Sequence, residues 1–170
     1  MSTSPAPPTA KPLPEGYALQ IGIPPPDDYL HLRAGSGLTP KNAAQAAAVA
    51  AGSWYGCYAT YTPHPSDDQP APAPTIVGMG RIIGDGAWYF HIADMAVLTA
   101  HQRKGLGDAI LKTLLAHIQA VAPEGLPLVN LLADPPGRRL YAQNGFVESA
   151  PDELGMQLPR TWVVQRGGGE

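Results

Sequence analysis

The sequence has few of the residues that mark several common classes of protein. Its single cysteine, Cys57, excludes an intrachain disulfide and argues against a cysteine-based zinc site. No apolar run approaches the roughly 20 residues of a membrane-spanning helix, and the N-terminus lacks the apolar segment of a secretory signal. The formal net charge of −3 offers no basic excess for nucleic-acid phosphates. We therefore expect a cytoplasmic protein with no nucleic-acid or membrane partner and no bound metal.

The same cysteine is not a convincing nucleophile. Cys57 lies within the apolar, aromatic stretch SWYGCYATY. Free cysteine behaves as a small buried hydrophobe in such surroundings, which favours a buried strand residue.

Proline and glycine are plentiful, with 20 and 19 copies, and they are clustered. The prolines of residues 1–14 predict a disordered tail, those of residues 63–74 predict a long loop, and the closing GGGE (167–170) predicts a flexible end. The length of 170 residues and the 44% hydrophobic content predict one domain, over residues 15–166, with a sizeable core.

Periodicity and turn residues predict the order βααβββαβαβ, an α/β or α+β domain around a central mixed sheet. The helix over 39–52 is expected to start with Thr39 as N-cap and Pro40 at the first helical position. Asp-Gly at 85–86 predicts a hairpin turn. The expected strands cover 17–23, 53–62, 75–84, 87–97 and 126–133, with closing strands in FVES and LGMQLP, and the helices cover 27–33, 39–52, 104–121 and 134–145.

The stretch VLTAHQRKGLGDAILKTLLAHI (97–118) joins a strand to an amphipathic helix through a basic, glycine-spaced turn. Unpaired N–H groups and the macrodipole favour an anion at a helix start. The missing side chains at Gly105 and Gly107 let an anion approach closely, and Arg103 and Lys104 add positive charge. The turn is therefore a candidate pyrophosphate site. The alternative is an ordinary turn in which the glycines relieve close packing.

Two known phosphate-binding loops do not match. The P-loop pattern GxxxxGK[ST] is absent, and the third glycine of a Rossmann GxGxxG fingerprint is replaced by Ile110. The turn also follows a hairpin, late in the chain, which argues against a Rossmann-type nucleotide binder.

Two motifs together resemble the GCN5-related N-acetyltransferase (GNAT) superfamily, whose members bind acetyl-CoA. Gln102-x-x-Gly105-x-Gly107 is similar to the family's pyrophosphate loop, and LYAQNGF places Tyr141 in register with its closing Tyr-x-x-x-Gly-Phe. The resemblance covers about residues 75–158. It implies the GNAT fold, a central mixed sheet of about six to seven strands, splayed at the cofactor site and flanked by about four helices.

The resemblance also implies where acetyl-CoA binds. The pantetheine arm would lie where strands 87–97 and 126–133 splay apart, against the backbone of Met95, Ala96 and Val97. Many relatives carry Asn at the position of Asp134, and because an ionised Asp only accepts hydrogen bonds, that contact must differ here. Arg138 could meet the CoA phosphates or remain a solvated surface residue. The backbone N–H groups expected to hold the pyrophosphate belong to Gln102, Arg103, Lys104, Gly105, Leu106 and Gly107.

Three residues are candidates for the chemistry of a direct acetyl transfer. Tyr141 matches the tyrosine that protonates the departing sulfur in many relatives, or it is a packing aromatic. His91 suits a water-relayed base because histidine titrates near neutral pH, and it matches one of two strand histidines of the arylalkylamine acetyltransferases, the second being Ala93 here. Asp94 is a candidate base or ammonium binder, or a backbone cap.

Strand alternation predicts that His91 shares a face with Met95 and Val97, and that Asp94 shares the other with Phe90, Ile92 and Ala96.

We therefore predict an acetyl-CoA-dependent N-acetyltransferase that acts on a small-molecule primary amine. Strand aromatics such as Trp54, Tyr55 and Trp88 would suit an arylalkylamine such as tyramine or tryptamine, and a polyamine is a further candidate. The alternatives are a peptide or protein acetyltransferase and a non-catalytic acyl-CoA sensor; Tyr141 favours an enzyme. The resemblance further suggests a homodimer.

Overall fold

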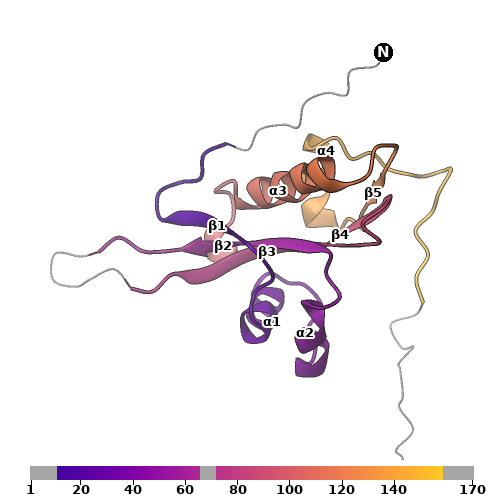
Figure 1. The fold of residues 1–170 in the computed structure, drawn as a ribbon. Helices are drawn as coiled ribbons and strands as arrows, with labels where there is room; N and C mark the ends of the chain where they lie inside the picture. The colour runs from indigo at the N-terminus through magenta and orange to yellow at the C-terminus, as the bar shows by residue number, and fades with distance from the viewer. Residues whose placement is uncertain (1–10, 66–71, 159–170) are drawn as a thin grey trace, which may run out of the picture.

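The structure is a computed structural model that describes residues 11–65 and 72–158 (Figure 1). Its centre is a five-stranded sheet of order β1-β2-β3-β4-β5. The first four strands pair antiparallel, whereas the last pair is parallel. The strands are β1 (Tyr17–Ile21), β2 (Tyr55–Tyr61), β3 (Thr75–Gly84), β4 (Tyr89–Val97) and β5 (Leu128–Asn130).

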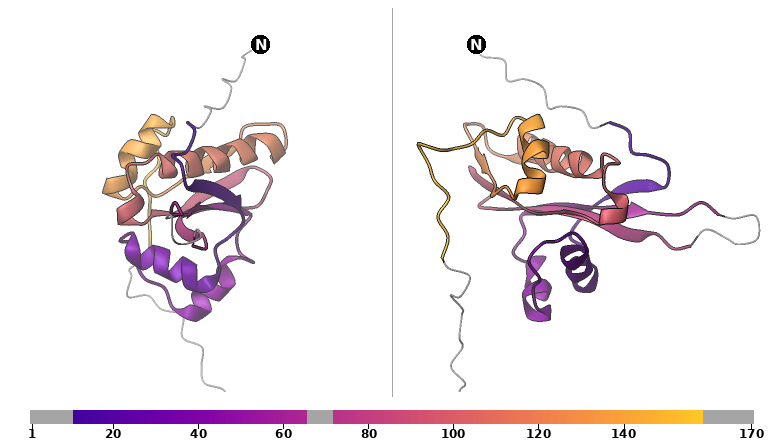
Figure 2. Two further views of the ribbon diagram at one scale, coloured as in Figure 1. Left: turned by 90° about the vertical axis from the view of Figure 1, so that its left-hand side faces the viewer. Right: turned by 180° about the vertical axis from the view of Figure 1, so that it is seen from behind.

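Helices cover both faces of the sheet. Helices α1 (Pro26–Gly35) and α2 (Ala43–Val49) lie on one face, and α3 (Leu106–Val121) and α4 (Arg138–Gln143) lie on the other (Figures 1 and 2). Short 3₁₀ turns, η1 (Thr99–His101) and η2 (Pro135–Gly137), precede α3 and α4. The predicted α/β class with a mixed sheet and four helices is confirmed, although the described residues form five strands instead of six or seven. None of the helices in these ranges is long and apolar enough to cross a membrane.

Each helical layer encloses its own apolar core. The predicted inner face of α3 is buried, and it packs on strand residues such as Ile82 and Phe90. Burial of one such side chain stabilises the fold by about 1.5–3 kcal/mol. A second cluster under α1 and α2 contains Tyr29, Leu32, Ala46, Met79 and Ala96.

Cys57 belongs to the α3 core, as the sequence predicts for a buried strand residue. Its side chain is fully buried, and its thiol donates to the carbonyl of Ile110 at 3.8 Å. Burial raises the pKa of the Cys57 thiol to about 12, so the thiolate needed for nucleophilic attack does not form near neutral pH.

Two of the predicted helix and strand boundaries are wrong for local reasons. Helix α2 starts after Asn42, not after Thr39, because Asn42 and Gln45 form a reciprocal capping box that satisfies two backbone donors. Strand β5 is much shorter than 126–133. Pro127 has no N–H to continue the ladder upstream, and the first bond runs from Leu128 N–H to the Trp88 carbonyl at 2.7 Å.

The predicted closing strands are also absent from the described part of the chain. Residues 146–158 hold no strand, and Val147 and Met156 are 89% and 95% exposed. Apolar residues signal a strand only where a neighbouring strand and a covered face are available. The final residue of LGMQLP, Pro159, lies outside the described residues.

The predicted tails and loop fall largely outside the described ranges. Residues 1–10 of the expected tail, 66–71 of the expected loop and the closing 167–170 are not described. Leu13, within the expected tail, packs against the α3 core.

Candidate active site

Strands β4 and β5 run side by side only over a short distance. Their parallel pairing covers Tyr89–His91 against Leu128–Asn130, and His91 opposite Asn130 is the last pair. β4 continues to Val97, paired only with β3. The backbone of residues 92–97 therefore has a β3 partner on one side and no β5 partner on the other. This is the splayed geometry expected for the predicted pantetheine segment, which includes Met95, Ala96 and Val97.

A β-bulge interrupts β4 within this open segment. Met79 pairs with Ala96 and Arg81 pairs with Ala93, so Asp94 and Met95 together lie opposite Gly80. Asp94 has a φ of 54°, in the left-handed region.

The bulge makes the predicted alternation of β4 side chains wrong. Phe90 and Ile92 lie in the α3 core, and Met95 and Val97 pack against that same core. Asp94 instead contacts α1, and Ala96 belongs to the cluster under α1 and α2. The extra residue shifts the two-residue period by one, so that Met95 and Val97 do not share the face of His91.

The glycine turn opens α3 as the sequence predicts. Gly105 is the N-cap with a φ of 83°, and nothing lies within 4 Å of where its Cβ would stand. The first intrahelical bond closes from the Ala109 N–H to the Gly105 carbonyl at 3.0 Å, so the preceding N–H groups, including those of Leu106 and Gly107, have no partner within the helix. Gly107 has a different reason to be glycine, because a Cβ there would stand 3.3 Å from Leu140 of α4.

The basic residues of the turn are free to meet an anion. Arg103 and Lys104 are exposed, and Arg103 has a φ of 62°. The Gln102 side chain turns inward, and its Nε2 donates to the Val97 carbonyl at 3.0 Å. Gln102 therefore joins the glycine turn to the end of the open β4 segment.

Helix α4 places Tyr141 beside this turn. Tyr141 is half-buried, its ring is 6.0 Å from that of Phe146, and both rings pack against the α3 core. Burial, and then the negative charge of Asp134, raise the pKa of the Tyr141 phenol. The phenol therefore stays protonated at neutral pH, which is the state that an acid requires.

A polar bridge fastens α4 to the first turn of α3. The Asn144 amide donates to Asp108 Oδ1 and to the Leu140 carbonyl, both at 2.9 Å. Lys112 donates to Asp108 Oδ2 at 2.7 Å. Together with the contact between Leu140 and Gly107, this bridge couples the position of Tyr141 to that of the glycine turn.

His91 lies in a short hydrogen-bonded chain at the point where β4 and β5 separate. Its Nδ1 is 2.7 Å from Asn130 Oδ1, and the Asn130 amide nitrogen donates to the Tyr89 hydroxyl at 3.1 Å. Because an amide oxygen only accepts, Nδ1 carries the proton and Nε2 of the neutral ring keeps a free lone pair. Asn130 is a site residue that the sequence reasoning missed. Its signal was a single amide inside the apolar run LPLVNLLA.

Asp94 does not share this hydrogen-bonded chain. Its carboxylate binds Arg33 and Arg81, and it accepts a hydrogen bond from the Tyr29 hydroxyl. Burial alone would raise the pKa of Asp94, but the hydrogen bond and charge of Arg81, with further contributions from Tyr29 and Arg33, hold it below its usual range. A carboxylate so occupied is a weak base, and its role as a base stays a prediction that these contacts disfavour.

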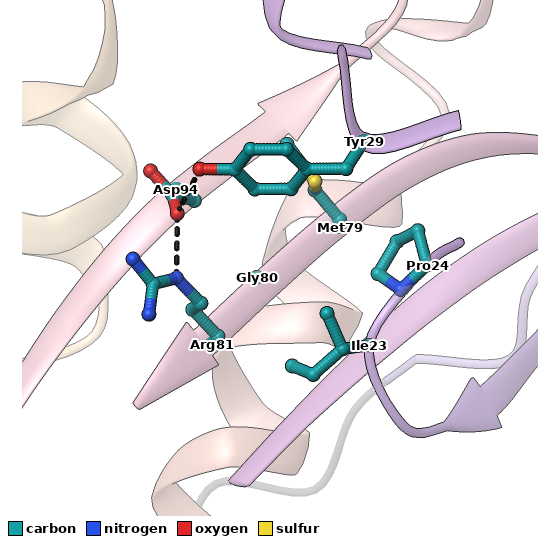
Figure 3. A pocket seen from close by; sticks show the side chains of 7 residues that line it. All are labelled: Ile23, Pro24, Tyr29, Met79, Gly80, Arg81 and Asp94. Atoms are coloured by element: carbon teal, nitrogen blue, oxygen red, sulfur yellow. Dashed lines mark hydrogen bonds and ion pairs between the residues drawn. The ribbon is translucent and has the colours of Figure 1, made fainter. Parts of the chain in front are cut away.

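The hollow beside Asp94 is small. It measures about 160 Å³, solvent at its mouth included, and is lined by Ile23, Pro24, Tyr29, Met79, Gly80, Arg81 and Asp94 (Figure 3). This volume lies below the roughly 300 Å³ at which ligand pockets begin, so we do not place the acceptor there.

The remaining two predicted cofactor residues lie around η2. Asp134 is exposed at the N-cap of η2, and its side chain makes no capping hydrogen bond. Arg138 is exposed at the start of α4, and its Nε donates to the Ala133 carbonyl at 3.4 Å. Both side chains are therefore accessible to a ligand near Tyr141.

Comparisons with known proteins agree with this geometry. A family model described as an acetyltransferase (GNAT) domain matches residues 69–148. Among solved structures, a protein of unknown function from meticillin-resistant Staphylococcus aureus, described as a probable acetyltransferase, is 31% identical with a TM-score of 0.71; the match covers 84% of this chain and 98% of that chain. No curated protein matches.

More distant structures share the fold. An acetyltransferase of the GNAT family from Streptococcus pneumoniae is 20% identical with a TM-score of 0.61, over 88% of this chain and 99% of that one. Glucosamine-6-phosphate N-acetyltransferase from Arabidopsis thaliana is 13% identical with a TM-score of 0.56. That match covers 84% of this chain and 99% of that chain. At these identities the likeness shows the fold alone.

The splayed strands, the glycine turn and the family match define an acyltransferase enzyme. The chain belongs to the GNAT superfamily of acetyltransferases.

Proposed function

We propose that this protein transfers an acetyl group from acetyl-CoA directly to the primary amine of a small molecule. One observation carries the proposal. The unpaired backbone of β4, the start of α3 and Tyr141 are held together by the Gln102–Val97 contact and by the bridge from Asn144 to Asp108. These elements supply the donors that an acyl-CoA needs, next to a protonated phenol.

The residues present fit acetyl-CoA. The N–H groups from Arg103 to Gly107 lie at a helix start, which favours a pyrophosphate, and the exposed Arg103 and Lys104 add charge. The Gln102 N–H is not among these donors, because it donates to the Thr99 carbonyl at 3.3 Å. The open backbone of residues 95–97 offers hydrogen bonds to the pantetheine amides and polarises the thioester carbonyl. In this proposal the exposed Arg138 binds a phosphate of the cofactor. Asp134, which cannot donate when ionised, contributes its negative charge beside Tyr141.

The base in this proposal is His91. An alkylammonium must lose a proton before its nitrogen can attack, because its pKa is about 10. The Asn130 hydrogen bond leaves Nε2 of His91 as the acceptor, which takes that proton directly or through water. The new C–N bond forms as the C–S bond breaks, and the acylated nitrogen then releases its second proton to solvent.

The acid is Tyr141. Its raised pKa keeps the hydroxyl protonated, so it can donate a proton to the departing sulfur and later regain one from solvent. No covalent enzyme intermediate is needed.

The surroundings of His91 favour an acceptor with an apolar or aromatic body. Ile83, Tyr89 and Leu128 are 38%, 39% and 38% exposed, and the β-pairs Ile83–His91 and Tyr89–Leu128 place them beside the base. Asp94, the candidate ammonium binder on this hairpin, is already engaged by Arg33, Arg81 and Tyr29. This arrangement supports an arylalkylamine over a polyamine.

The alternatives remain a peptide or protein N-terminus or lysine as the acceptor, and an acyl-CoA sensor without turnover. A homodimer and a cytoplasmic location also stay proposals. Thiol release from acetyl-CoA against tyramine, tryptamine, spermidine, glucosamine, amino acids and lysine peptides tests the enzyme and its acceptor together. Fastest turnover with an arylalkylamine supports the proposal, and turnover of lysine peptides alone contradicts the small-molecule acceptor. Tight acetyl-CoA binding without turnover would favour a sensor.

A further inference from the structure

A buried ion cluster lies at the β4 bulge. Asp94 Oδ1 accepts from Arg33 Nη1, and Oδ2 accepts from Arg81 Nε at 2.6 Å and from the Tyr29 hydroxyl at 2.8 Å. The side chains of Arg33, Asp94 and Arg81 are 8%, 11% and 15% exposed. Figure 3 shows the side chains of Tyr29 and Arg81 both directed toward the Asp94 carboxylate.

Both arginines are held at a second point. Arg33 Nε donates to the Thr39 carbonyl at 2.8 Å, and Arg81 Nη1 donates to Ser53 Oγ at 3.1 Å. Ser53 in turn donates to the Val49 carbonyl at 2.6 Å. The carboxylate is therefore fixed from α1, from β3 and from the chain that follows α2, with little freedom to move.

The backbone that this carboxylate holds is unusual. A φ of 54° at Asp94 is seldom adopted by residues other than glycine, although aspartate tolerates it better than most. Gly80 makes room on the opposite strand, since a Cβ there would stand 2.6 Å from Met95 Sδ. Such a backbone conformation is retained where several surrounding contacts hold it in place.

The bulge decides which backbone groups point toward the open side of β4. In a regular strand the N–H and C=O groups alternate between the two neighbouring strands, and one extra residue shifts that alternation. Met95 and Ala96 follow Asp94 directly, in the segment that has no β5 partner. A change at Asp94 would therefore redirect the donors that face the thioester.

We propose that Asp94 is a positioning residue, whose ion cluster with Arg33, Arg81 and Tyr29 holds the β4 bulge and so aims the Met95 backbone at the acetyl-CoA thioester. The catalytic part of this proposal rests on the proposed function, whereas the control of the bulge does not. Two positive charges around one carboxylate disfavour its protonation, so the cluster acts through geometry and not by proton transfer.

The test compares Asp94→Asn, which keeps the shape and loses the charge, with Tyr29→Phe, which removes one donor to Asp94 and a long contact from Arg33 Nη1. Asp85→Asn is the matched control, because it makes the same charge change in the exposed turn of the same hairpin. Two quantities are measured for each: hydrogen exchange of the amides of residues 92–97 without ligand, and kcat and KM for acetyl-CoA per folded molecule, as functions of pH.

We expect Asp94→Asn to speed exchange in this segment at least tenfold and to lower kcat at least tenfold, with the acid limb of the pH profile unmoved. Tyr29→Phe should shift both quantities about threefold in the same direction, and Asp85→Asn should shift neither. The effects of Asp94→Asn and Tyr29→Phe should not add in the double variant, because both act through one carboxylate.

Unchanged exchange and kcat in Asp94→Asn would overturn the proposal. So would loss of the acid limb, or rescue by an added small base, since either makes Asp94 the base. If Asp94→Asn does not fold, Tyr29→Phe decides in the same way. If no amine is acetylated, the exchange data alone decide: faster exchange supports control of the bulge, and unchanged exchange refutes it, independently of the proposed function.

Discussion

In the proposed mechanism His91 and Tyr141 transfer the protons, and each has a polar neighbour that affects its protonation. Asn130 accepts from Nδ1 of His91 at 2.7 Å and leaves Nε2 free to act as a base. A tyrosine phenol is protonated at neutral pH, and burial and the charge of Asp134 raise the pKa of Tyr141 further. Asp94, the other candidate base on this strand, is engaged by two arginines. His91 is therefore the stronger candidate for the base.

Replacing His91 with Gln should remove the base while keeping a side chain that can bond Asn130. We expect kcat/KM for the amine to fall by about 100-fold, the usual contribution of general base catalysis, with little change in the Kd for acetyl-CoA. His31→Gln, at an exposed position of α1, is the control. An unchanged kcat/KM in His91→Gln would assign the base elsewhere.

Replacing Tyr141 with Phe should separate chemistry from binding. The ring and its packing against Phe146 remain, so we expect the Kd for acetyl-CoA to change less than about twofold while kcat falls at least about tenfold. Calorimetry and steady-state rates measure the two quantities, with Tyr58→Phe on β2 as the control. An unaltered kcat would remove Tyr141 from the acid role.

At the scale of secondary-structure elements, the site depends on the junction between α3 and α4. Gly105 turns the chain into α3 with a φ of 83°, whereas Gly107 leaves room for Leu140. Sequence reasoning gave both glycines one purpose, the approach of an anion. The structure shows two separate structural demands, conformation at one glycine and helix packing at the other.

Replacing Gly105 and Gly107 by alanine should therefore destabilise the protein to different extents. Gly105→Ala must place an L-residue in the left-handed region, which costs about 1–2 kcal/mol, although its Cβ meets no atom within 4 Å. Gly107→Ala needs only a small shift of the flexible end of Leu140. We therefore expect urea unfolding to show the larger loss of stability for Gly105→Ala. The reverse order would mean that helix packing is the stricter demand.

Much of the element order was predictable because its signals are local. The β3–β4 hairpin and the inner face of α3 follow from turn residues and periodicity, whereas the placement of β4 beside β5 was implied by the family resemblance. The β4 bulge did not follow, because no local pattern around Asp94 reports the glycine across the sheet or the arginines that bind its carboxylate. Asn130 was missed for the same reason: its partner His91 is 39 residues away in the sequence.

At the scale of the whole molecule, the Asp94 cluster ties the α1 layer to the sheet. The pKa of Asp94 is held below its usual range by Arg81, Tyr29 and Arg33 despite burial. A carboxyl group with a lowered folded-state pKa stabilises the fold above the unfolded value of about 4, and this stabilisation is lost as the pH falls toward the folded value.

Asp94→Asn should therefore destabilise the protein in a pH-dependent way. Removing one partner of a buried ion pair costs about 3 kcal/mol or more, so we expect a difference of that size from wild type at pH 7. The difference should shrink as the pH falls below about 4, because the unfolded wild-type chain then binds a proton that the folded Asp94, with its lowered pKa, does not. Urea unfolding between pH 3 and pH 7 measures it, and a pH-independent difference would argue against an ionised Asp94.

The central claim is direct transfer of an acetyl group from acetyl-CoA to a primary amine. Mass spectrometry of the protein and of tyramine or tryptamine, sampled together during a single turnover with acetyl-CoA, tests it most directly. The account predicts that the amine gains one acetyl group and that the protein gains none at any time. Transient acetylation of the protein before the amine, or an amine that stays unmodified while acetyl-CoA is bound, would contradict it.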